Sequence, residues 1–409
     1  MITDRIPSPL VSSGVPTTTA RARQLTMSRR RDATGAAPVS FPQLRLWFLD
    51  QLEPDSPQHC IGYAIRLRGT LDVTALTRSL NEIVRRHEIL RSTFHPFDEE
   101  PRQRVMPVRP FAVPTTDLES LPANRRMTEA RRLALEEVRQ PFKLESGPLM
   151  RAHLFRLGED EHLLALAWHN IVFDAASEDP FCAELNAFYA AYSRGAVVEL
   201  PEPGIQYADF AHWQRELQQG EDLATALAYW KSKLAGKPDT LGLPTDRPEP
   251  AIRTLRGGCV RLELGEELSK AVRRMSEAAG VKPYAVLMAT LQTLLNRYTG
   301  QDVTIGVLEA GRSAPQTADA IGFFVNTLPL HTDLSGNPPF REALGRVARS
   351  LEEAWAHGEL PFEKIVRLLQ PERALSRNPL FRIMFVMQAA PLRALALPGL
   401  QVTAEEMFA

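Results

Sequence analysis

From Ser40 onward, strand-like and helix-like patterns alternate along the chain, and this alternation is the strongest constraint on its fold. Residues 60–68 alternate apolar and polar side chains, as a half-buried strand does. Residues 72–86 then place apolar side chains at helical spacing, with Asp72 as the expected N-cap. The sequence therefore predicts an α/β fold.

The same patterns continue on both sides of a Pro- and Gly-rich stretch at 235–258. Further strands are predicted at 149–155, 162–168, 260–264, 303–308, 323–331 and 381–387. Further helices are predicted at 178–192, 209–217, 223–234, 268–279, 284–298, 340–356 and 361–369. Because Pro and Gly interrupt the periodicity, we expect lobes at about 40–215 and 250–409 joined by a connection at 216–249. A cleft between lobes is a common place for a ligand site.

Residues 1–39 differ in composition from the rest. They hold six Arg against two acidic residues, many Ser and Thr, and almost no apolar periodicity. Such a segment buries too little apolar surface to offset its ordering entropy, so we predict a disordered arm or linker. An Arg- and Ser-rich organellar presequence and a start of translation at Met27 are the alternatives.

Composition excludes several classes of protein. With 48 Lys and Arg against 49 Asp and Glu, the net charge is −1, which argues against a nucleic-acid binder. No apolar run approaches the roughly 20 residues of a membrane span. The three Cys residues are far apart and odd in number, so the sequence indicates no set of disulfides. This is typical of a reducing compartment, and we expect a cytoplasmic protein. His212, His331 and His357 lack metal-ligand spacing, and no Gly-rich phosphate loop occurs, so no metal site is predicted.

The most informative segment is 168–177, where a predicted apolar strand ends at His169 and a short loop carries Asp174 into a helix. Side chains at such a strand end are firmly aimed and are candidates for a functional site, although a lone His there is more typical of a hydrogen-bonded structural residue. Ser177 is either a hydrogen-bonding group of that site or the N-cap of the helix that begins near Glu178, and the pattern favours the cap.

This segment resembles the H-H-x-x-x-D-G motif of condensation domains from nonribosomal peptide synthetases, which belong to the chloramphenicol acetyltransferase-like acyltransferases. Six more segments resemble motifs of that family and follow in its order. They are FPQLRLWFL at 41–49, RHEILRSTF at 86–94, YADFAHW at 207–213, IGFFVNTLPL at 321–330, HGELPFEKIV at 357–366 and SRNPLF at 376–381.

The resemblance implies two chloramphenicol-acetyltransferase-like α/β lobes that form a V with a central tunnel. It implies amide-forming transfer of an acyl group from one carrier protein to an amine on another. The substrates are expected on phosphopantetheine arms of the partner carrier proteins, so no cofactor is expected on this chain. The expected partners are carrier proteins or adjacent synthetase domains, and neither nucleic acid nor membrane. Because the family continues beyond 376–381, the resemblance also implies that 250–409 is a truncated lobe of a longer synthetase, or a degenerate remnant.

The catalytic motif departs from the family at two positions. Asn170 stands where the family has the second His, and Ala175 stands where it has Gly. An imidazole can take up a proton near neutral pH, whereas a carboxamide can only form hydrogen bonds. Loss of a general base costs about 10²–10⁴-fold in rate, and positioning alone can supply much of the remaining acceleration. Alternatives are therefore a noncatalytic domain that recruits a partner enzyme, and an acyltransferase with another thioester or acceptor.

The resemblance also implies roles for the other motif residues. It assigns Asn170 to the catalytic position, with His169 and Asp174 framing it. Asp174 is expected to pair with an Arg across the lobe interface, with Arg312 as the candidate and Arg91 as the runner-up. Tunnel or structural support is expected from Arg312, Ser177, Asn326 and Asn378.

Overall fold

The computed structural model describes Met27 and residues 35–98, 100–217, 221–236, 243, 246–247, 257–369 and 380–407. Its contacts divide the chain into two compact units. The N-terminal unit contains the described residues of 20–219, 312–325 and 388–409, and the C-terminal unit those of 220–311 and 326–387. None of the described helices is both long enough and apolar enough to cross a membrane.

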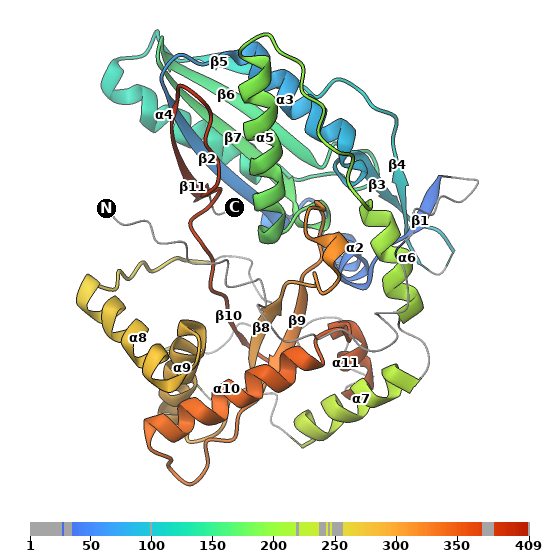
Figure 1. The fold of residues 1–409 in the computed structure, drawn as a ribbon, viewed down its shortest axis with the longest axis vertical. Helices are drawn as coiled ribbons and strands as arrows, with labels where there is room; N and C mark the ends of the chain where they lie inside the picture. The colour runs from blue at the N-terminus through green and yellow to red at the C-terminus, as the bar shows by residue number, and fades with distance from the viewer. Residues whose placement is uncertain are drawn as a thin grey trace. The chain divides into compact units, whose positions relative to one another are not determined.

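The N-terminal unit is built on a five-stranded sheet in the order β11-β2-β7-β6-β5 (Figure 1). Only the β5–β6 pair is parallel. Every residue of β7 after Glu161 is buried, because helices cover both faces of the sheet. The strands are β2 (Cys60–Arg68), β5 (Thr115–Asp117), β6 (Met150–Gly158), β7 (Glu161–His169) and β11 (Gln401–Met407).

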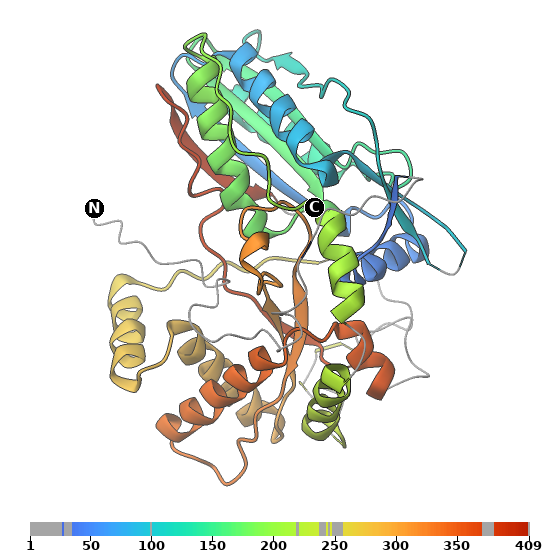
Figure 2. The same cartoon turned by 45° about the vertical axis from the view of Figure 1, so that its right-hand side comes forward.

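Three of the described helices cover this sheet, and Figure 2 shows the two that lie side by side on one of its faces. Helix α4 (Ala123–Arg139) packs Ala130 and Ala134 against one face. Helices α3 (Val73–Arg86) and α5 (Glu178–Tyr192) lie against each other on the opposite face. The structure thereby confirms the strands and helices predicted at 60–68, 72–86, 149–155, 162–168 and 178–192, and Asp72 caps α3 by accepting a hydrogen bond from the Ala75 N–H at 2.8 Å.

A second, three-stranded antiparallel sheet in this unit corrects part of the prediction for 1–39. Its order is β1 (Ala36–Pro38), β4 (Arg102–Val105) and β3 (Ser92–His95). Ala37 and Val39 are buried, so the end of the predicted disordered arm is ordered. The order comes from a distant partner, since β1 pairs with β4 and the Gln103 amide donates to the Pro38 carbonyl at 2.7 Å. The other residues of 1–34, apart from Met27, lie outside the described residues.

Shorter elements complete the N-terminal unit. Two more helices are α2 (Phe41–Leu52) and α6 (Tyr207–Leu217). Short 3-10 turns occur at η1 (Pro57–His59), η2 (Glu88–Arg91), η3 (Asn170–Val172), η4 (Ala175–Ser177) and η5 (Pro315–Thr317).

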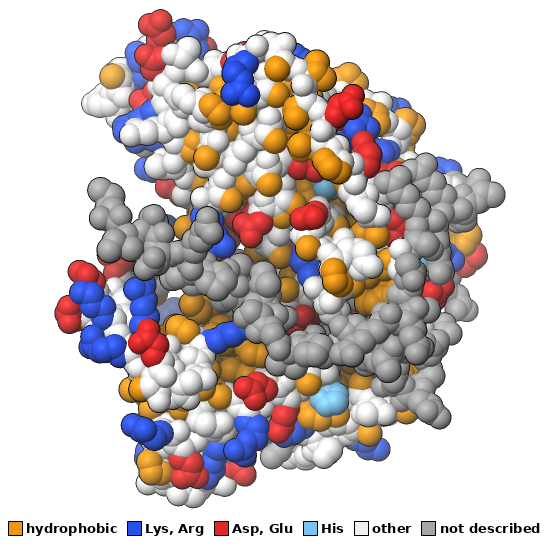
Figure 3. Space-filling model, in the orientation of Figure 1, with side chains coloured by type: hydrophobic (Ala, Val, Ile, Leu, Met, Phe, Trp, Pro, Cys, Tyr) orange, Lys and Arg blue, Asp and Glu red, His pale blue; other side chains and the backbone are white. Residues whose placement is uncertain are grey.

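In its described residues, the C-terminal unit contains a three-stranded sheet in the order β10-β8-β9, with five helices. The strands are β8 (Ile305–Glu309), β9 (Asn326–Leu330) and β10 (Ile383–Phe385), with β10 parallel and β9 antiparallel to β8. The helices are α7 (Glu221–Leu234), α8 (Glu266–Ala279), α9 (Pro283–Thr299), α10 (Phe340–Ala356) and α11 (Phe362–Leu369). Both signs of charge occur over α8 in the face drawn in Figure 3. Within α8, Lys270 lies 2.9 Å from Glu266.

The strand predicted at 260–264 is wrong. This segment has no strand partner among the described residues, and Val260 and Leu262 are 96% and 84% exposed. The strands predicted at 323–331 and 381–387 are also shorter than expected. Alternation of apolar side chains marks a segment that can form a strand, but a strand needs a neighbour for its backbone groups.

Two parts of the predicted division differ in the structure. Helix α7 lies inside the predicted connection but packs into the C-terminal unit through Trp230. Residues 312–325 and 388–407, predicted in the second lobe, pack with the N-terminal unit. There β11 pairs with β2, and the Asn186 side chain bonds the Ala394 carbonyl and the Ala396 N–H, both at 2.8 Å. Most of the Pro- and Gly-rich stretch at 235–258 lies outside the described residues.

Candidate functional site

His169 ends strand β7 and acts as a hydrogen-bond acceptor for the turn that follows. Its Nδ1 accepts from the Ile171 N–H at 3.0 Å, which places the ring proton on Nε2. The side chain is buried, and this burial, together with the neighbouring His59, lowers the pKa of His169 to about 3. His169 is therefore a neutral structural group at physiological pH.

Asn170 opens the turn η3, and its side chain is only half-buried. The Oδ1 atom, however, is buried and has no hydrogen-bond partner among the described residues. The turn is held from α2, where the Gln43 amide donates to the Ile171 carbonyl at 3.0 Å and also takes part in a capping box with Ser40. The turn thus presents a fixed carboxamide with an unused acceptor.

Asp174 lies in a buried network of hydrogen bonds, and the predicted ion pair with Arg312 is present at 3.0 Å. The same Oδ1 accepts from the Ser177 N–H and hydroxyl at 2.8 and 2.7 Å, and Oδ2 accepts from the Phe324 N–H at 2.9 Å. All four residues belong to the N-terminal unit, whereas the resemblance implied a pair across the lobe interface. Four hydrogen-bond donors occupy the Asp174 carboxylate, so its role is structural.

Arg91, the alternative partner, lies elsewhere. Its guanidinium is 3.7 Å from Glu88 and donates to the Met106 carbonyl at 2.6 Å.

The helix cap expected from Ser177 is wrong. Its side chain makes no cap hydrogen bond to α5, and its backbone already has helical angles. The hydroxyl instead donates to Asp174 and accepts from the Gly322 N–H at 3.1 Å and the Arg312 guanidinium at 3.0 Å. Ser177 therefore joins the end of the motif segment to residues 312–325.

Tyr207 brings two further motifs to the same place. Its hydroxyl donates to the Phe323 carbonyl at 2.5 Å and lies 2.8 Å from the Ser40 hydroxyl. Its ring packs so closely on Gly322 that a Cβ at that position would lie 2.0 Å from the Tyr207 Cδ2. Residues of four motifs, those at 41–49, 168–177, 207–213 and 321–330, meet here.

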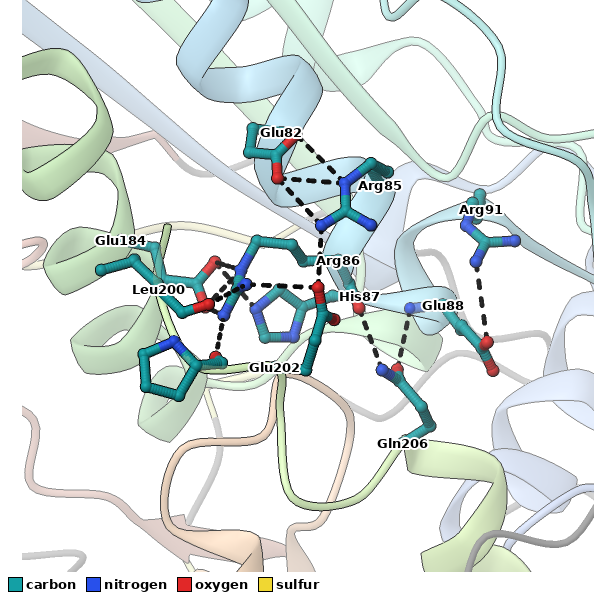
Figure 4. Close-up of polar contacts among 11 residues, drawn as sticks. Glu82, Arg85, Arg86, His87, Glu88, Arg91, Glu184, Leu200, Glu202 and Gln206 are labelled. Carbon is teal, nitrogen blue, oxygen red and sulfur yellow. Dashed lines mark hydrogen bonds and ion pairs between the residues drawn. The ribbon is translucent and has the colours of Figure 1, made fainter. Parts of the chain in front are cut away.

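The motif at 86–94 supports this region through a second buried cluster, drawn in Figure 4. The Arg86 guanidinium lies 3.1 Å from Glu184 on α5 and donates to the Pro201 carbonyl at 2.6 Å. His87 Nε2 lies 3.1 Å from the same carboxylate. The Gln206 amide then joins the Arg86 carbonyl to the Glu88 N–H, both at 2.9 Å, directly before Tyr207.

Glu184 and Gln206 were not singled out in the sequence. Burial of Glu184 favours its neutral form, but the interactions with His87 and Arg86 outweigh burial and hold the pKa of Glu184 below its usual value. Glu184 lies within a helical pattern, and only its distance from Arg86 in space identifies it.

Asn326, predicted as a support residue, acts within the C-terminal unit. Its amide donates to the Gly358 and Leu360 carbonyls, both at 2.8 Å, and its oxygen accepts from the Phe362 N–H at 3.1 Å. It thereby joins the motif at 321–330 to the motif at 357–366. Asn378 lies outside the described residues.

Within the motif segment, the side chain available for a hydrogen bond to a ligand is therefore the carboxamide of Asn170. Asp174 is occupied by its donors, and His169 is a buried, neutral acceptor. In the part of the chain that the structure describes, no group of three or more His, Cys, Asp and Glu side chains could hold a metal ion.

The low pKa of His169 predicts a specific acid sensitivity. In the unfolded chain this imidazole protonates near pH 6.5, whereas in the folded protein it does so near pH 3. Between these values the unfolded state binds the additional proton, so stability falls as the pH is lowered from 6.5 towards 3, by about 3 kcal/mol at pH 4. His169→Gln should remove this contribution, which melting curves from pH 7 to pH 4 would measure.

The control is His95→Gln, which changes a half-buried His that is hydrogen-bonded to Thr93 at 2.9 Å. The difference in Tm between the wild type and His169→Gln should narrow in acid. Two parallel lines of Tm against pH would contradict the prediction.

Comparison with known proteins identifies the family. Residues 33–407 match the model of the condensation domain family. The chain is 45% identical over 371 residues to a linear gramicidin synthase polypeptide of Brevibacillus parabrevis, and the match covers 90% of this chain and 7% of that protein. It is 42% identical over 364 residues to a chondramide synthase of Chondromyces crocatus, over 89% of this chain and 9% of that protein. The chain therefore spans only a small part of these relatives.

Solved structures agree. The X-domain from teicoplanin biosynthesis is 32% identical with a TM-score of 0.81, over 94% of this chain and 84% of that one. The X-domain in its complex with OxyB is also 32% identical, with a TM-score of 0.78, and the match covers 94% of this chain and 83% of that one. The first condensation domain of the CDA synthetase, at 23% identity and a TM-score of 0.74 over 91% and 86%, shares the fold. Because the family model covers most of the chain and the motifs follow in its order, this protein belongs to the condensation domain family of nonribosomal peptide synthesis.

Proposed function

We propose that this chain forms an amide between a thioester-bound acyl group and an amine, with Asn170 positioning the amine instead of acting as a base. The observation that carries the proposal is the buried Asn170 Oδ1, which lacks a hydrogen-bond partner among the described residues. The turn that holds it is fixed by the hydrogen bonds of Ile171 with Gln43 and His169. A buried acceptor without a donor is costly, and an incoming amine N–H would supply the donor.

The reaction needs no proton on Asn170. The amine nitrogen attacks the thioester carbonyl carbon, the C–N bond forms, and the C–S bond breaks. The proton lost by nitrogen passes to the leaving thiolate, directly or through water. Asn170 contributes by holding the nitrogen in line for attack, which is the kind of acceleration that orientation provides.

Both substrates would arrive on phosphopantetheine arms of carrier proteins or neighbouring synthetase domains, so the chain itself would bind no cofactor. The similarity to linear gramicidin synthase supports this assignment of partners.

A single-turnover assay tests the proposal. Acyl-pantetheine donors and amine acceptors are mixed with the wild type, Asn170→Ala and Asn170→His, and the amide is followed by mass. We expect the wild type to form amide, Asn170→Ala to be at least about tenfold slower because one hydrogen bond is lost, and Asn170→His to be faster because a base is restored.

The matched control is Asn124→Ala, which removes an exposed amide on α4 and should leave the rate unchanged. A wild type that forms no amide, beside an active Asn170→His, would refute the proposal and leave only the loss of the base.

A noncatalytic recruiting domain is the second candidate. It is favoured by the similarity to the X-domain, which has been solved in complex with OxyB, and by the lack of a titratable side chain at position 170. Its signature is binding of a tailoring enzyme in size-exclusion chromatography without amide formation. Amide formation by the wild type would rule out this candidate.

A further inference from the structure

His59 lies beside the position of the missing imidazole, although it is 111 residues away in the chain. It is the last residue of η1, directly before β2. The antiparallel pairing of β2 with β7 ends at Cys60 and His169. His59 directly precedes β2 at the end of η1, and Asn170 directly follows β7 at the start of η3. The rings of His59 and His169 are 6.1 Å apart, which places His59 at the edge of the motif.

Two polar atoms at this edge are buried and unused. His59 Nε2 and Asn170 Oδ1 both lack a hydrogen-bond partner among the described residues. Each such atom costs on the order of 1–3 kcal/mol, so two of them at neighbouring strand ends call for an explanation. A ligand that offers two donors would satisfy both.

The imidazole is suited to accept a hydrogen bond. Burial, with a further contribution from the charge of Arg45, lowers the pKa of His59 to about 4. His59 is therefore neutral at pH 7, and with its proton on Nδ1 the Nε2 lone pair is available. The neighbouring His169 ring is neutral, and Phe142 packs edge-on against it with the ring centroids 6.1 Å apart.

We propose that His59 Nε2 and Asn170 Oδ1 together receive the two N–H groups of a primary amine. This inference rests on the proposed amide formation and specifies its acceptor class. A primary amine has two N–H groups and satisfies both atoms, whereas a secondary amine such as that of proline has one. The chain should therefore prefer α-primary amines, and the preference should depend on His59.

The test compares alanyl-pantetheine with prolyl-pantetheine as acceptors in the single-turnover assay. The variants are His59→Leu, which removes the acceptor atom, and His59→Gln, which keeps one. For the alanyl acceptor, His59→Leu should lower kcat/KM about tenfold, the effect of one hydrogen bond, and His59→Gln should stay within about threefold of the wild type. For the prolyl acceptor, His59→Leu should change little.

His95→Leu is the control for the loss of an imidazole elsewhere, and circular dichroism establishes that each variant is folded. His59→Phe, which keeps an aromatic ring, replaces His59→Leu if the latter is unfolded. An active wild type whose rates with both acceptors are unchanged in His59→Leu would overturn the role of His59 and leave amide formation intact. A wild type inactive with both acceptors would overturn the proposed function, and the amine contact with it.

Discussion

Asp174→Ala should lower the free energy of unfolding by about 3–5 kcal/mol, because it leaves a buried guanidinium without its counter-charge. The side chains of Asp174 and Arg312 are only 1% and 10% exposed. The substitution also removes the acceptor for the Ser177 and Phe324 N–H groups. Urea unfolding followed by circular dichroism measures the loss.

A double-mutant cycle separates the charge from the packing. Asp174→Ala combined with Arg312→Met should be less destabilised than the sum of the two single variants, since no unpaired charge remains. The control is Asp319→Ala, an exposed acidic residue in the same segment as Arg312, and it should change stability by less than about 0.5 kcal/mol. A folded Asp174→Ala protein with the wild-type midpoint would show that the pair is dispensable.

Glu184→Gln should cost about 3 kcal/mol at pH 7, because it removes the charge that faces Arg86 while keeping the side-chain volume. Arg86 and Glu184 are only 4% and 13% exposed. Since the pKa of Glu184 is lowered on folding, its contribution is complete above about pH 4.3 and is lost as the pH falls further. The same urea experiment measures the difference.

The network drawn in Figure 4 supplies a matched control. Glu202→Gln makes the same chemical change on a side chain that is 54% exposed and lies 2.9 Å from Arg85 and 3.7 Å from Arg86. Exposed pairs contribute about 0–1 kcal/mol, so this variant should be close to the wild type. Equal losses in the two variants would mean that burial does not govern the strength of these pairs.

The local sequence pattern predicted helices and strands correctly where the neighbouring elements that they pack against or pair with are also present. Strand β2 and helix α3 begin and end as expected, because alternation, helical spacing and the Asp72 cap are all local signals. The segment 260–264 alternates equally well but finds no neighbour among the described residues, and β1 forms within an Arg-rich stretch because β4 pairs with it. The local alternation of side chains does not show which distant segment a strand will pair with.

The residues of the candidate site also fall into those that could be predicted from the sequence and those that depend on distant contacts. The motif segment followed from the resemblance, and so did the pair of Asp174 with Arg312, although Arg312 lies outside the seven motif segments. The partners of Ser177 and the place of His59 did not, because each depends on a contact between segments more than 100 residues apart. Glu184 lacks any motif of its own.

The discontinuity of the N-terminal unit has a consequence for its synthesis on the ribosome. Its sheet receives β11 only after residue 407 has been made, and Asp174 waits for Arg312 until the chain is 138 residues longer. Until then β2 has an open edge, and a nascent chain exposes unpaired backbone groups there. The segments of the C-terminal unit are made before the N-terminal unit is complete, so the N-terminal unit cannot finish folding before they have been synthesised. Cutting the gene after α6 would likewise separate Asp174 and Glu178 from the partners that neutralise and hold them.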